Sequence, residues 1–545
     1  MTSDDLSPDA TSDLDERSGA APSEGPAVDR LLLGVTALSV LVGTVLRFLP
    51  RSALWLDEAL TVNISTLPLD QIAGALKRDG HPPLFYYLLN LWTEIGGTSD
   101  WWVRALPGVI SLISLPLAYL AGRRLAERAG SGPLGVRRTG LITLAVMAML
   151  PYGIRYGAET RMYSLAITLV MGGYLLVDDL LSARSSGRRR VAVTVGAALV
   201  TAAALWAHYW SMWLLAVVGL LALHQAFRAR TPETRTGGRL LTGALVAGGV
   251  LFLPWVPTLL YQNSHTGTPW GKSFGPVEVA TITIQDFSGD ALTSYLAVAF
   301  ALLAVVATIL VRRDDELVVL TSSVQPRIRL ELLVLLGTIG VGWATAAVSG
   351  NTYSSRYGAV VFPLYVLCVA GGVAVIRHRR ATAAALAVLL VLSSYVAVSV
   401  LAEDRTQAGA IGERILAAAD DDAPGSIVVA CPDQIGVALQ RVLEQGDPSL
   451  RVIPFPTEGD PHFVDWVDYA DRNAAADPAE FHARVVEDLP DDATVRLVVM
   501  PGYKTFDSKC EQLINLFGAD RPQIDQVDPE ETGEGMGMWV FGPKA

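Results

Sequence analysis

Apolar residues occur in blocks of about twenty along most of the chain, and short polar connections separate the blocks. A helix of about 20 apolar residues is long enough to cross the roughly 30 Å of hydrocarbon in a bilayer. The pattern therefore predicts an α-helical polytopic membrane protein. It places eleven spans, at residues 31–49, 103–122, 140–157, 162–180, 191–207, 210–227, 240–260, 291–311, 330–348, 357–376 and 381–401.

A long polar and aromatic loop, residues 50–102, separates the first two spans. Within it, residues 83–95 have a helical apolar pattern but are short for a span. Counting them as a span would reverse the side of the membrane assigned to every later loop. We expect an interfacial helix there, with its aromatic residues at headgroup depth. Residues 67–77 carry apolar side chains at a helical spacing and predict a second interfacial helix.

The N-terminal tail, residues 1–30, is rich in Asp, Ser, Pro and Gly and is expected to be disordered in the cytoplasm. The first span is followed by Pro50 and Arg51 and not by a small-residue cleavage site. This predicts a signal anchor and not a cleaved signal peptide. The transmembrane domain then covers residues 31–401.

Residues 402–545 predict a soluble α/β domain of about four strands, because strand-like and helical segments alternate there. Its two cysteines, Cys431 and Cys510, either pair as a disulfide or stay free. Trp466 and Tyr469 either contact a ligand or pack in the core. The expected strands lie at 426–431, 495–500 and 538–542, and the expected helices at 434–445, 478–488 and 509–517.

Charge is distributed unevenly along the chain. The formal net charge is -12, with about -6 on residues 1–30, about -17 on residues 402–545 and about +11 on the part between. The basic residues of the middle part lie in every second connection, which places those connections in the cytoplasm. The loop at 50–102 and the C-terminal domain then face outward. The chain has no overall excess of basic residues, so its charge does not indicate a nucleic-acid partner.

Ionisable residues are nearly absent from the middle of the predicted spans and collect at their outer ends. An ion-coupled transporter would be expected to carry charges near the bilayer midplane. The pattern therefore favours an enzyme that acts at the outer surface on a substrate held in the outer leaflet. The residues at these outer ends are Asp57, Glu58, His81, Arg104, Arg155, Glu159, Arg161, His208, Lys272 and Arg356.

Four motifs carry a resemblance to a known family. They read WLDEA after the first span, HPPLFYYLLNLW before the second, GAETRMYSL at the start of the fourth and SSRYGAVVFPL leading into a late span. Over about residues 30–400 the chain resembles the GT-C superfamily of membrane glycosyltransferases, in the branch of protein O-mannosyltransferases and the lipid A aminoarabinose transferase. The resemblance implies inverting transfer of a sugar from a polyprenyl-phosphate donor to a cell-envelope glycan, glycolipid or protein hydroxyl.

The bias toward Ala, Val, Asp and Arg resembles that of a high-GC actinobacterium, where mannose and arabinofuranose are the expected sugars. The sequence does not choose between them. We expect a multi-pass protein of a bacterial plasma membrane. Two other classes stay open: a lipid-linked sugar flippase or transporter, which should line a polar path through the bilayer, and a non-catalytic scaffold, which should tolerate loss of Asp57.

The resemblance also implies roles for individual residues. Asp57 matches the first acidic position of the family and would take the proton from the acceptor hydroxyl, while Glu58 would orient the acceptor or assist. Arg161 and Arg356 match motif positions and would bind the phosphate leaving group through their guanidinium groups. Further donor or phosphate contacts are expected from His81, Tyr163, Tyr357 and Lys272, with Glu159 and Arg155 as supporting residues.

Each assignment has a structural alternative. His81 could cap the helix that follows it, and Glu159 could simply pair with Arg161 or Arg155. The two site arginines could anchor span ends at headgroups, the two tyrosines could belong to an aromatic belt, and the loop at 267–275 could be a lid or only a connection. No cluster of His and Cys has metal-ligand spacing, so neither a metal nor a cofactor is predicted.

Overall fold

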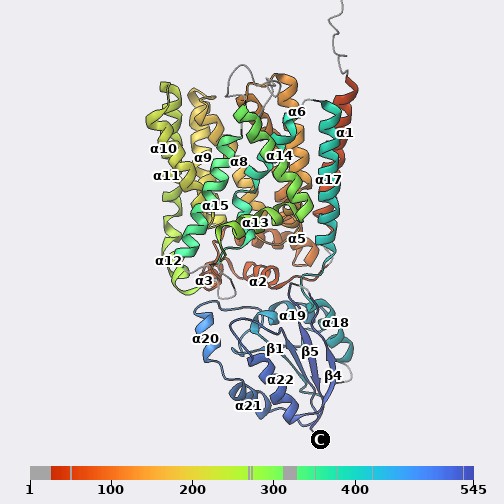
Figure 1. Cartoon of the computed structure of the whole chain (residues 1–545). Helices are drawn as coiled ribbons and strands as arrows, with labels where there is room; N and C mark the ends of the chain where they lie inside the picture. The colour runs from red at the N-terminus through yellow and green to blue at the C-terminus, as the bar shows by residue number, and fades with distance from the viewer. Residues whose placement is uncertain are drawn as a thin grey trace, which may run out of the picture.

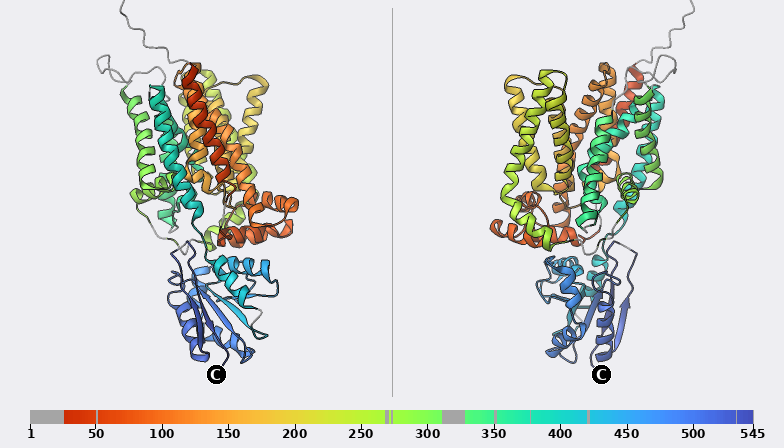
Figure 2. Two further views of the ribbon diagram at one scale, coloured as in Figure 1. Left: turned by 90° about the vertical axis from the view of Figure 1, so that its right-hand side faces the viewer. Right: turned by 60° about the vertical axis from the view of Figure 1, so that its left-hand side comes forward.

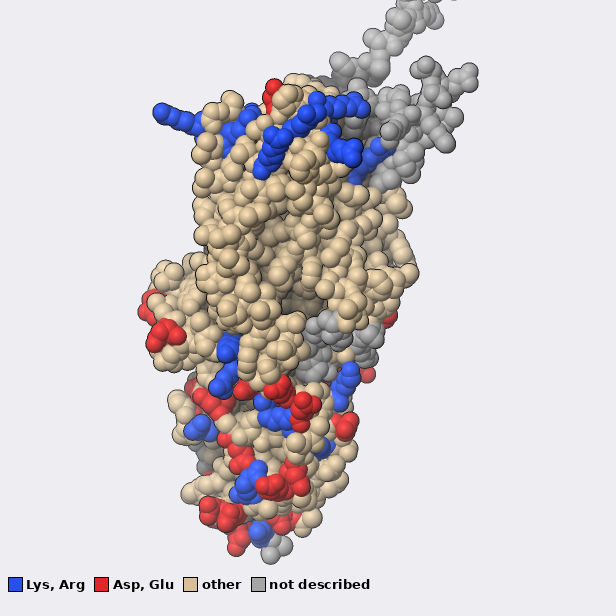
Figure 3. All heavy atoms as spheres, turned by 90° about the vertical axis from the view of Figure 1, so that its left-hand side faces the viewer, with Lys and Arg blue, Asp and Glu red and all other residues tan. Residues whose placement is uncertain are grey.

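The computed structural model consists of a helical bundle with a small α/β domain at one end (Figure 1). The described residues are 26–49, 52–267, 271, 274–310, 328–349, 352–376, 378–419, 422–531 and 533–544. Lys272 and the first 25 residues of the predicted tail lie outside this set. On the face drawn in Figure 3, a broad uncharged band of the bundle lies between Lys and Arg at its far end and the mixed charges of the α/β domain.

Long helices of the bundle coincide with the predicted spans. Seven helices in the described part of the chain are long and apolar enough to cross a membrane, and three shorter apolar helices accompany them. Every predicted span overlaps a helix, which confirms the predicted fold class. These helices are α1 (Pro26–Leu46), α5 (Asp100–Arg128), α6 (Pro133–Met149), α8 (Tyr163–Leu181), α9 (Gly187–Ala207), α10 (Ser211–Arg228), α11 (Pro232–Phe252), α14 (Ala291–Leu310), α15 (Arg329–Ser349), α16 (Phe362–Val375) and α17 (Arg379–Ala402).

Prolines account for two differences between predicted and observed limits. The span predicted at 140–157 is wrong in its limits, because α6 ends where a proline opens the separate short helix α7 (Pro151–Arg155). The span predicted at 240–260 is interrupted, because α11 passes into the 3-10 turn η1 (Leu253–Trp255) and then into α12 (Val256–His265). Proline lacks an N–H and clashes with the preceding turn, so it starts helices more readily than it continues them.

Three short helices of the loop between the first two spans lie across the end of the bundle, between it and the α/β domain (Figure 2). Helices α3 (Leu69–Asp79) and α4 (Leu84–Gly96) form where the sequence predicted interfacial helices. Helix α2 (Leu56–Ser65) was not predicted, and it carries the acidic pair. Leu91 and Ile95 on α4 are exposed apolar side chains, which fits a helix lying against lipid.

The α/β domain contains a five-stranded sheet in the order β2-β1-β3-β5-β4. Strand β1 runs parallel to β2 and β3, and β5 runs antiparallel to β3 and β4. The elements are α18 (Ala408–Ala419), β1 (Ile427–Cys431), α19 (Asp433–Gly446), β2 (Val452–Pro454), α20 (Tyr469–Ala475), α21 (Pro478–Glu487), β3 (Val495–Val499), α22 (Lys509–Asp520), β4 (Gln523–Val527) and β5 (Gly537–Phe541).

Both faces of this sheet are buried. Val428 on β1 packs in the cluster formed with α18 and α19, while Val429 packs in the larger core that includes residues of α22. Central strands covered on both faces read as continuous apolar runs, which is why β1 and β3 could be predicted. Strand β2 has only three residues and β4 is an exposed polar edge, so neither gave a clear signal.

A disulfide joins the end of β1 to α22. Cys431 and Cys510 form this bond across a sequence separation of 79 residues, so the pairing that the sequence left open is present. Cys368 is a buried free cysteine within α16.

Candidate active site

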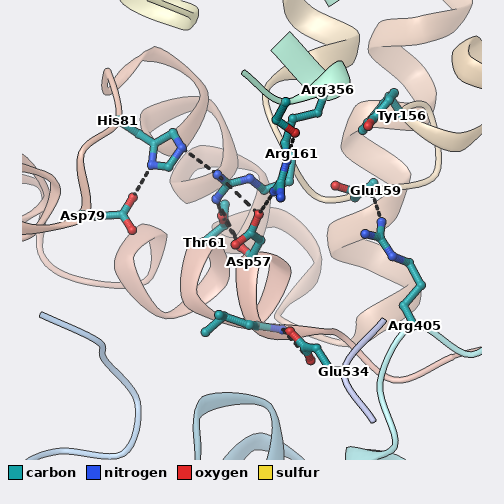
Figure 4. Close-up of polar contacts among 12 residues, drawn as sticks. Asp57, Thr61, Asp79, His81, Tyr156, Glu159, Arg161, Arg356, Arg405 and Glu534 are labelled. Carbon is teal, nitrogen blue, oxygen red and sulfur yellow. Dashed lines mark hydrogen bonds and ion pairs between the residues drawn. The ribbon is translucent and has the colours of Figure 1, made fainter. Parts of the chain in front are cut away.

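The candidate site surrounds the first turn of α2, at the end of the bundle that faces the α/β domain (Figure 4). Trp55 precedes the helix in an extended conformation, so Asp57 and Glu58 fall within the first turn. Successive residues of an α-helix point about 100° apart. The two neighbouring carboxylates therefore face different surroundings.

Asp57 points toward two arginines that come from distant parts of the chain. Arg356, in the short turn η2 (Ser355–Val360), donates to Asp57 Oδ2 over 2.6 Å, and the Arg161 guanidinium lies 3.9 Å from the same oxygen. Burial raises the pKa of Asp57, but Arg161 and Arg356 outweigh it and hold the pKa below its ordinary value. The Asp57 side chain is still 19% exposed, so a substrate can reach it.

Arg161 is fixed by several acceptors at once. Its guanidinium donates to Thr61 Oγ1 over 2.7 Å and to the Asp57 carbonyl over 3.2 Å, and it lies 2.8 Å from His81 Nε2. The side chain is 2% exposed. A guanidinium held on several sides loses little freedom when a ligand arrives, which makes Arg161 a preorganised cation.

His81 belongs to a short relay that ends at Asp79. Its Nδ1 lies 2.8 Å from the Asp79 carboxylate, which also accepts from the Tyr86 hydroxyl over 3.0 Å. Because a guanidinium only donates, His81 Nε2 accepts from Arg161 and the ring proton sits on Nδ1. Burial raises the pKa of Asp79, but His81 outweighs it and the pKa is lowered.

The carboxylate of Glu58 is hydrogen-bonded to neighbouring segments and holds α2 in place. Its two oxygens accept from Arg104 over 2.9 and 2.6 Å, and the Thr160 amide donates to it over 2.8 Å. The residue is 0% exposed. Burial raises its pKa, but Arg104 outweighs it and the pKa lies below the ordinary value. The geometry therefore leaves no oxygen of Glu58 open toward a substrate.

Glu159 and Arg155 do not pair with the partners that the sequence suggested. Glu159 forms an ion pair with Arg405, which lies in the segment leading to the α/β domain. Arg155 donates to Asp286 over 3.0 Å, on helix α13 (Pro276–Ser288). The alternative that Glu159 simply pairs with Arg161 or Arg155 does not hold among the described residues, because Arg155 pairs with Asp286 and Arg161 is held by other acceptors.

A cavity of about 390 Å³ opens beside this cluster and is lined by residues of α10, α12 and α15 together with the loop around His81. We call it the outer cavity; its polar and aromatic lining includes His81, His208, Tyr209, Trp210, Gln262 and Tyr357. Burial lowers the pKa of His208 to about 3, so this imidazole is neutral at physiological pH.

The two candidate tyrosines occupy different places. Tyr357 lines the outer cavity and stacks on Trp210 with ring centroids 5.5 Å apart. Tyr163 is 1% exposed and packs against Tyr156 at 4.6 Å and His208 at 5.7 Å. Of the pair, Tyr357 is thus the one that faces the cavity.

Two further hollows lie between neighbouring helices of the bundle, the first of them between α9, α10 and α11. Met212 lines both the outer cavity and a middle hollow. The middle hollow shares Thr201, Leu215 and Leu245 with an inner hollow of about 250 Å³, which reaches Arg128 at the other end of the bundle. The three spaces therefore lie next to one another, and Arg128, Asp178 and Glu331 make the far end of the inner hollow polar.

Several residues of the site were not identified from the sequence. Asp79 stands two positions before His81 in the same motif, and this proximity was an available signal. There was no such signal in the sequence for Asp286, Arg405 and Glu534, because their partners lie far away in the chain. Among the described residues, no group of three or more His, Cys, Asp or Glu side chains is arranged to hold a metal ion.

The apolar helices define a multi-pass membrane protein, and the candidate site lies at one end of its bundle. No protein-family model matches the chain, and no curated protein matches it in sequence. Solved structures do match. ArnT from Cupriavidus metallidurans bound to undecaprenyl phosphate has a TM-score of 0.55 and 14% identity, over 93% of this chain and 97% of that chain.

The apo form of the same ArnT has a TM-score of 0.55 and 12% identity, over 94% of this chain and 98% of that chain. The oligosaccharyltransferase of Archaeoglobus fulgidus in complex with zinc and sulfate has a TM-score of 0.48 and 12% identity, over 92% of this chain and 72% of that chain. The likeness to ArnT extends over nearly the whole of both chains. The chain therefore has the GT-C fold.

Proposed function

We propose that this protein is an inverting glycosyltransferase that moves a sugar from a polyprenyl-phosphate carrier to a hydroxyl group at the outer face of the membrane. The observation that carries the proposal is the convergence of one buried and one partly exposed guanidinium on a single reachable carboxylate. Arg161 and Arg356 meet at Asp57, at the edge of a cavity lined by aromatic and apolar side chains.

In this mechanism Asp57 accepts the proton of the acceptor hydroxyl as its oxygen attacks the anomeric carbon. The new C–O bond forms on the face opposite the leaving group, the bond to the phosphate oxygen breaks, and the configuration inverts. The lowered pKa of Asp57 keeps it ionised before the substrate binds. When the donor phosphate draws Arg356 away, Asp57 loses a neutralising partner and becomes a stronger base.

The leaving group is a phosphate, which needs charge stabilisation and not a proton. Arg161 and Arg356 supply it, because a guanidinium can bind phosphate oxygens through two parallel hydrogen bonds. The relay from Asp79 through His81 keeps Arg161 oriented. The protein with the similar fold, ArnT, is bound to undecaprenyl phosphate, which supports a carrier of this class.

The neighbouring hollows support an isoprenoid as the lipid part of the donor. The middle and inner hollows are lined mostly by Leu, Val, Ala and Gly, a lining that an apolar chain can fill without leaving polar groups unpaired. A nucleotide sugar has no comparable apolar part. We therefore assign the outer cavity to the phosphate and sugar, and the hollows beyond Met212 to the isoprenoid chain.

The proposal places the α/β domain outside the cell and the N-terminus in the cytoplasm. Lys and Arg gather at the end of the bundle away from the α/β domain (Figure 3), and basic residues favour the cytoplasmic side. The disulfide of the α/β domain fits an oxidising exterior. Mannose or arabinofuranose is the sugar we propose, with a cell-envelope glycan, glycolipid or protein as acceptor.

Sugar transfer in membranes tests this function. Wild type, Asp57→Asn and the control Asp70→Asn, an exposed acid on α3, are supplied with polyprenyl-phosphomannose or polyprenyl-phosphoarabinose and envelope glycan. We expect transfer from one donor in the wild type and the control, and a loss of about 10²- to 10⁴-fold in Asp57→Asn.

Two results would contradict the proposal. Equal transfer by wild type and Asp57→Asn would remove Asp57 as the base. Movement of the lipid-linked sugar across the bilayer without transfer to any acceptor would favour the alternative function, a flippase.

A further inference from the structure

The α/β domain touches the first turn of α2 directly. Both carboxyl oxygens of Glu534 accept from the Leu56 amide, over 3.0 and 3.2 Å, across 478 residues of sequence. Glu534 is buried, at 7% exposure. Trp55, which precedes the helix, makes no capping hydrogen bond through its side chain. The capping acceptor for this helix end thus comes from another domain.

Arg405 reinforces the contact from the segment that joins α17 to the α/β domain. Its guanidinium pairs with Glu159 and lies 4.1 Å from the centroid of the Trp55 ring. The same ring lies 5.7 Å from the guanidinium of Arg356, the arginine that binds Asp57. The guanidiniums of Arg405 and Arg356 therefore both lie close to the ring of Trp55, the residue that precedes the first turn of α2.

Main-chain hydrogen bonds hold these two contacts together. The Glu534 amide donates to the Arg405 carbonyl over 2.9 Å, and the Gln407 amide donates to the Glu534 carbonyl over 3.2 Å. We call Arg405, Gln407 and Glu534 the α2 clamp. Its members are fixed relative to one another by backbone, so the clamp acts on α2 as one unit.

The first amides of a helix lack partners within the helix and need an acceptor from elsewhere. Loss of a capping acceptor destabilises the end of a helix and lets its first turn fray. Asp57 directly follows the capped residue Leu56. Fraying would move its carboxylate relative to the acceptor hydroxyl, and a displacement of about 1 Å can cost about a hundredfold in rate.

We propose that Glu534 is a positioning residue of the active site, through which the α/β domain holds the first turn of α2 and sets the direction of the Asp57 carboxylate. This inference rests on the proposed function. If Glu534 positions Asp57 in this way, the α/β domain contributes to every catalytic cycle. Arg161 and His81 are held by other partners, so donor binding should depend little on Glu534.

The test uses the full-length protein with Glu534→Ala, Glu534→Gln and the control Glu531→Ala, an exposed residue on the same segment. Transfer kinetics give kcat and the donor KM, and amide hydrogen exchange is followed in α2. We expect Glu534→Ala to lower kcat about tenfold or more, to change the donor KM less than about threefold, and to speed exchange only in the first turn of α2. Glu534→Gln retains an acceptor oxygen and should recover most of kcat.

Unchanged kcat and unchanged exchange in Glu534→Ala would overturn the inference. So would faster exchange throughout the protein with a matching loss of folded protein, because that marks a purely structural role. If the wild type transfers no sugar while α2 still loosens in Glu534→Ala, the proposed function fails and the clamp contact stands.

Discussion

At the residue scale, the site depends on the difference between an arginine and a generic positive charge. Arg161 contacts Thr61, the Asp57 carbonyl and His81 at the same time. A planar guanidinium can serve acceptors in several directions, whereas the ammonium of lysine is a compact point charge on a flexible chain. The geometry at this position is therefore as important as the charge.

We predict that Arg161→Lys lowers kcat/KM for transfer about a hundredfold and raises the donor KM, although the charge is kept. Arg78→Lys is the control, because Arg78 pairs with Asp465 at the surface and its side chain is 69% exposed. Steady-state transfer measurements on both variants check this. Activity of Arg161→Lys within about threefold of wild type would show that charge alone suffices.

The sequence identified Asp57, His81, Arg161 and Arg356, and the structure brings these four together. They could be predicted because they stand in motifs that resemble those of the GT-C superfamily, in connections expected on one side of the membrane. Their individual partners could not be predicted. Glu159 has arginines close to it in sequence, yet its partner is Arg405, because tertiary packing and not sequence distance decides which charges meet.

At the element scale, α2 is held against α5 by a buried ion pair. The Arg104 and Glu58 side chains are 5% and 1% exposed. Removing one partner of such a pair leaves an uncompensated buried charge and typically costs about 3–5 kcal/mol, much more than the loss of an exposed pair.

We predict that Arg104→Met strongly lowers the midpoint of thermal unfolding in detergent, and that adding Glu58→Gln restores part of the loss. The control is Arg124→Met on the same helix, whose pair with Glu127 is partly exposed and should contribute less than about 1 kcal/mol. Strictly additive effects of Arg104→Met and Glu58→Gln would mean that the two residues do not stabilise each other.

The long helices could be predicted from the sequence, whereas α2 could not. About twenty apolar residues in a row have one simple solution in a bilayer. The segment LDEALTVNIS is short, and its Thr61, Val62 and Ile64 are β-branched residues that favour strands. It becomes helical because neighbours bury most of it and Glu534 caps it, and both effects are tertiary.

At the scale of the whole molecule, the junction between the two domains contains a carboxyl group whose ionisation is linked to folding. Burial raises the pKa of Glu534 from its ordinary value of 4.5 to about 8, although hydrogen bonds from Leu56 and Thr406 work against it. The folded protein therefore binds this proton more tightly than the unfolded chain does. The resulting stabilisation is complete below about pH 4.5 and is lost as the pH rises toward 8.

We predict that the midpoint of thermal unfolding falls between pH 5 and pH 8 more steeply in the wild type than in Glu534→Gln, which resembles the protonated form. Unfolding scans in detergent at several pH values check this. Parallel curves for the two proteins would contradict it, since they would mean that Glu534 titrates alike in the folded and unfolded states.

The join between α17 and the α/β domain has a consequence for how acceptors reach the site. Helix α17 ends at Ala402, and Arg405, only a few residues later, is already bonded to Glu159. A hinge needs a stretch of chain that is free to change direction. The segment between α17 and the α/β domain is instead anchored at the candidate site through Arg405. Under the proposed function, we expect the domain to stay fixed over the site and a bulky acceptor to enter from the side, along the membrane surface. Acceptor size would be limited by the width of that side entrance and not by an opening motion.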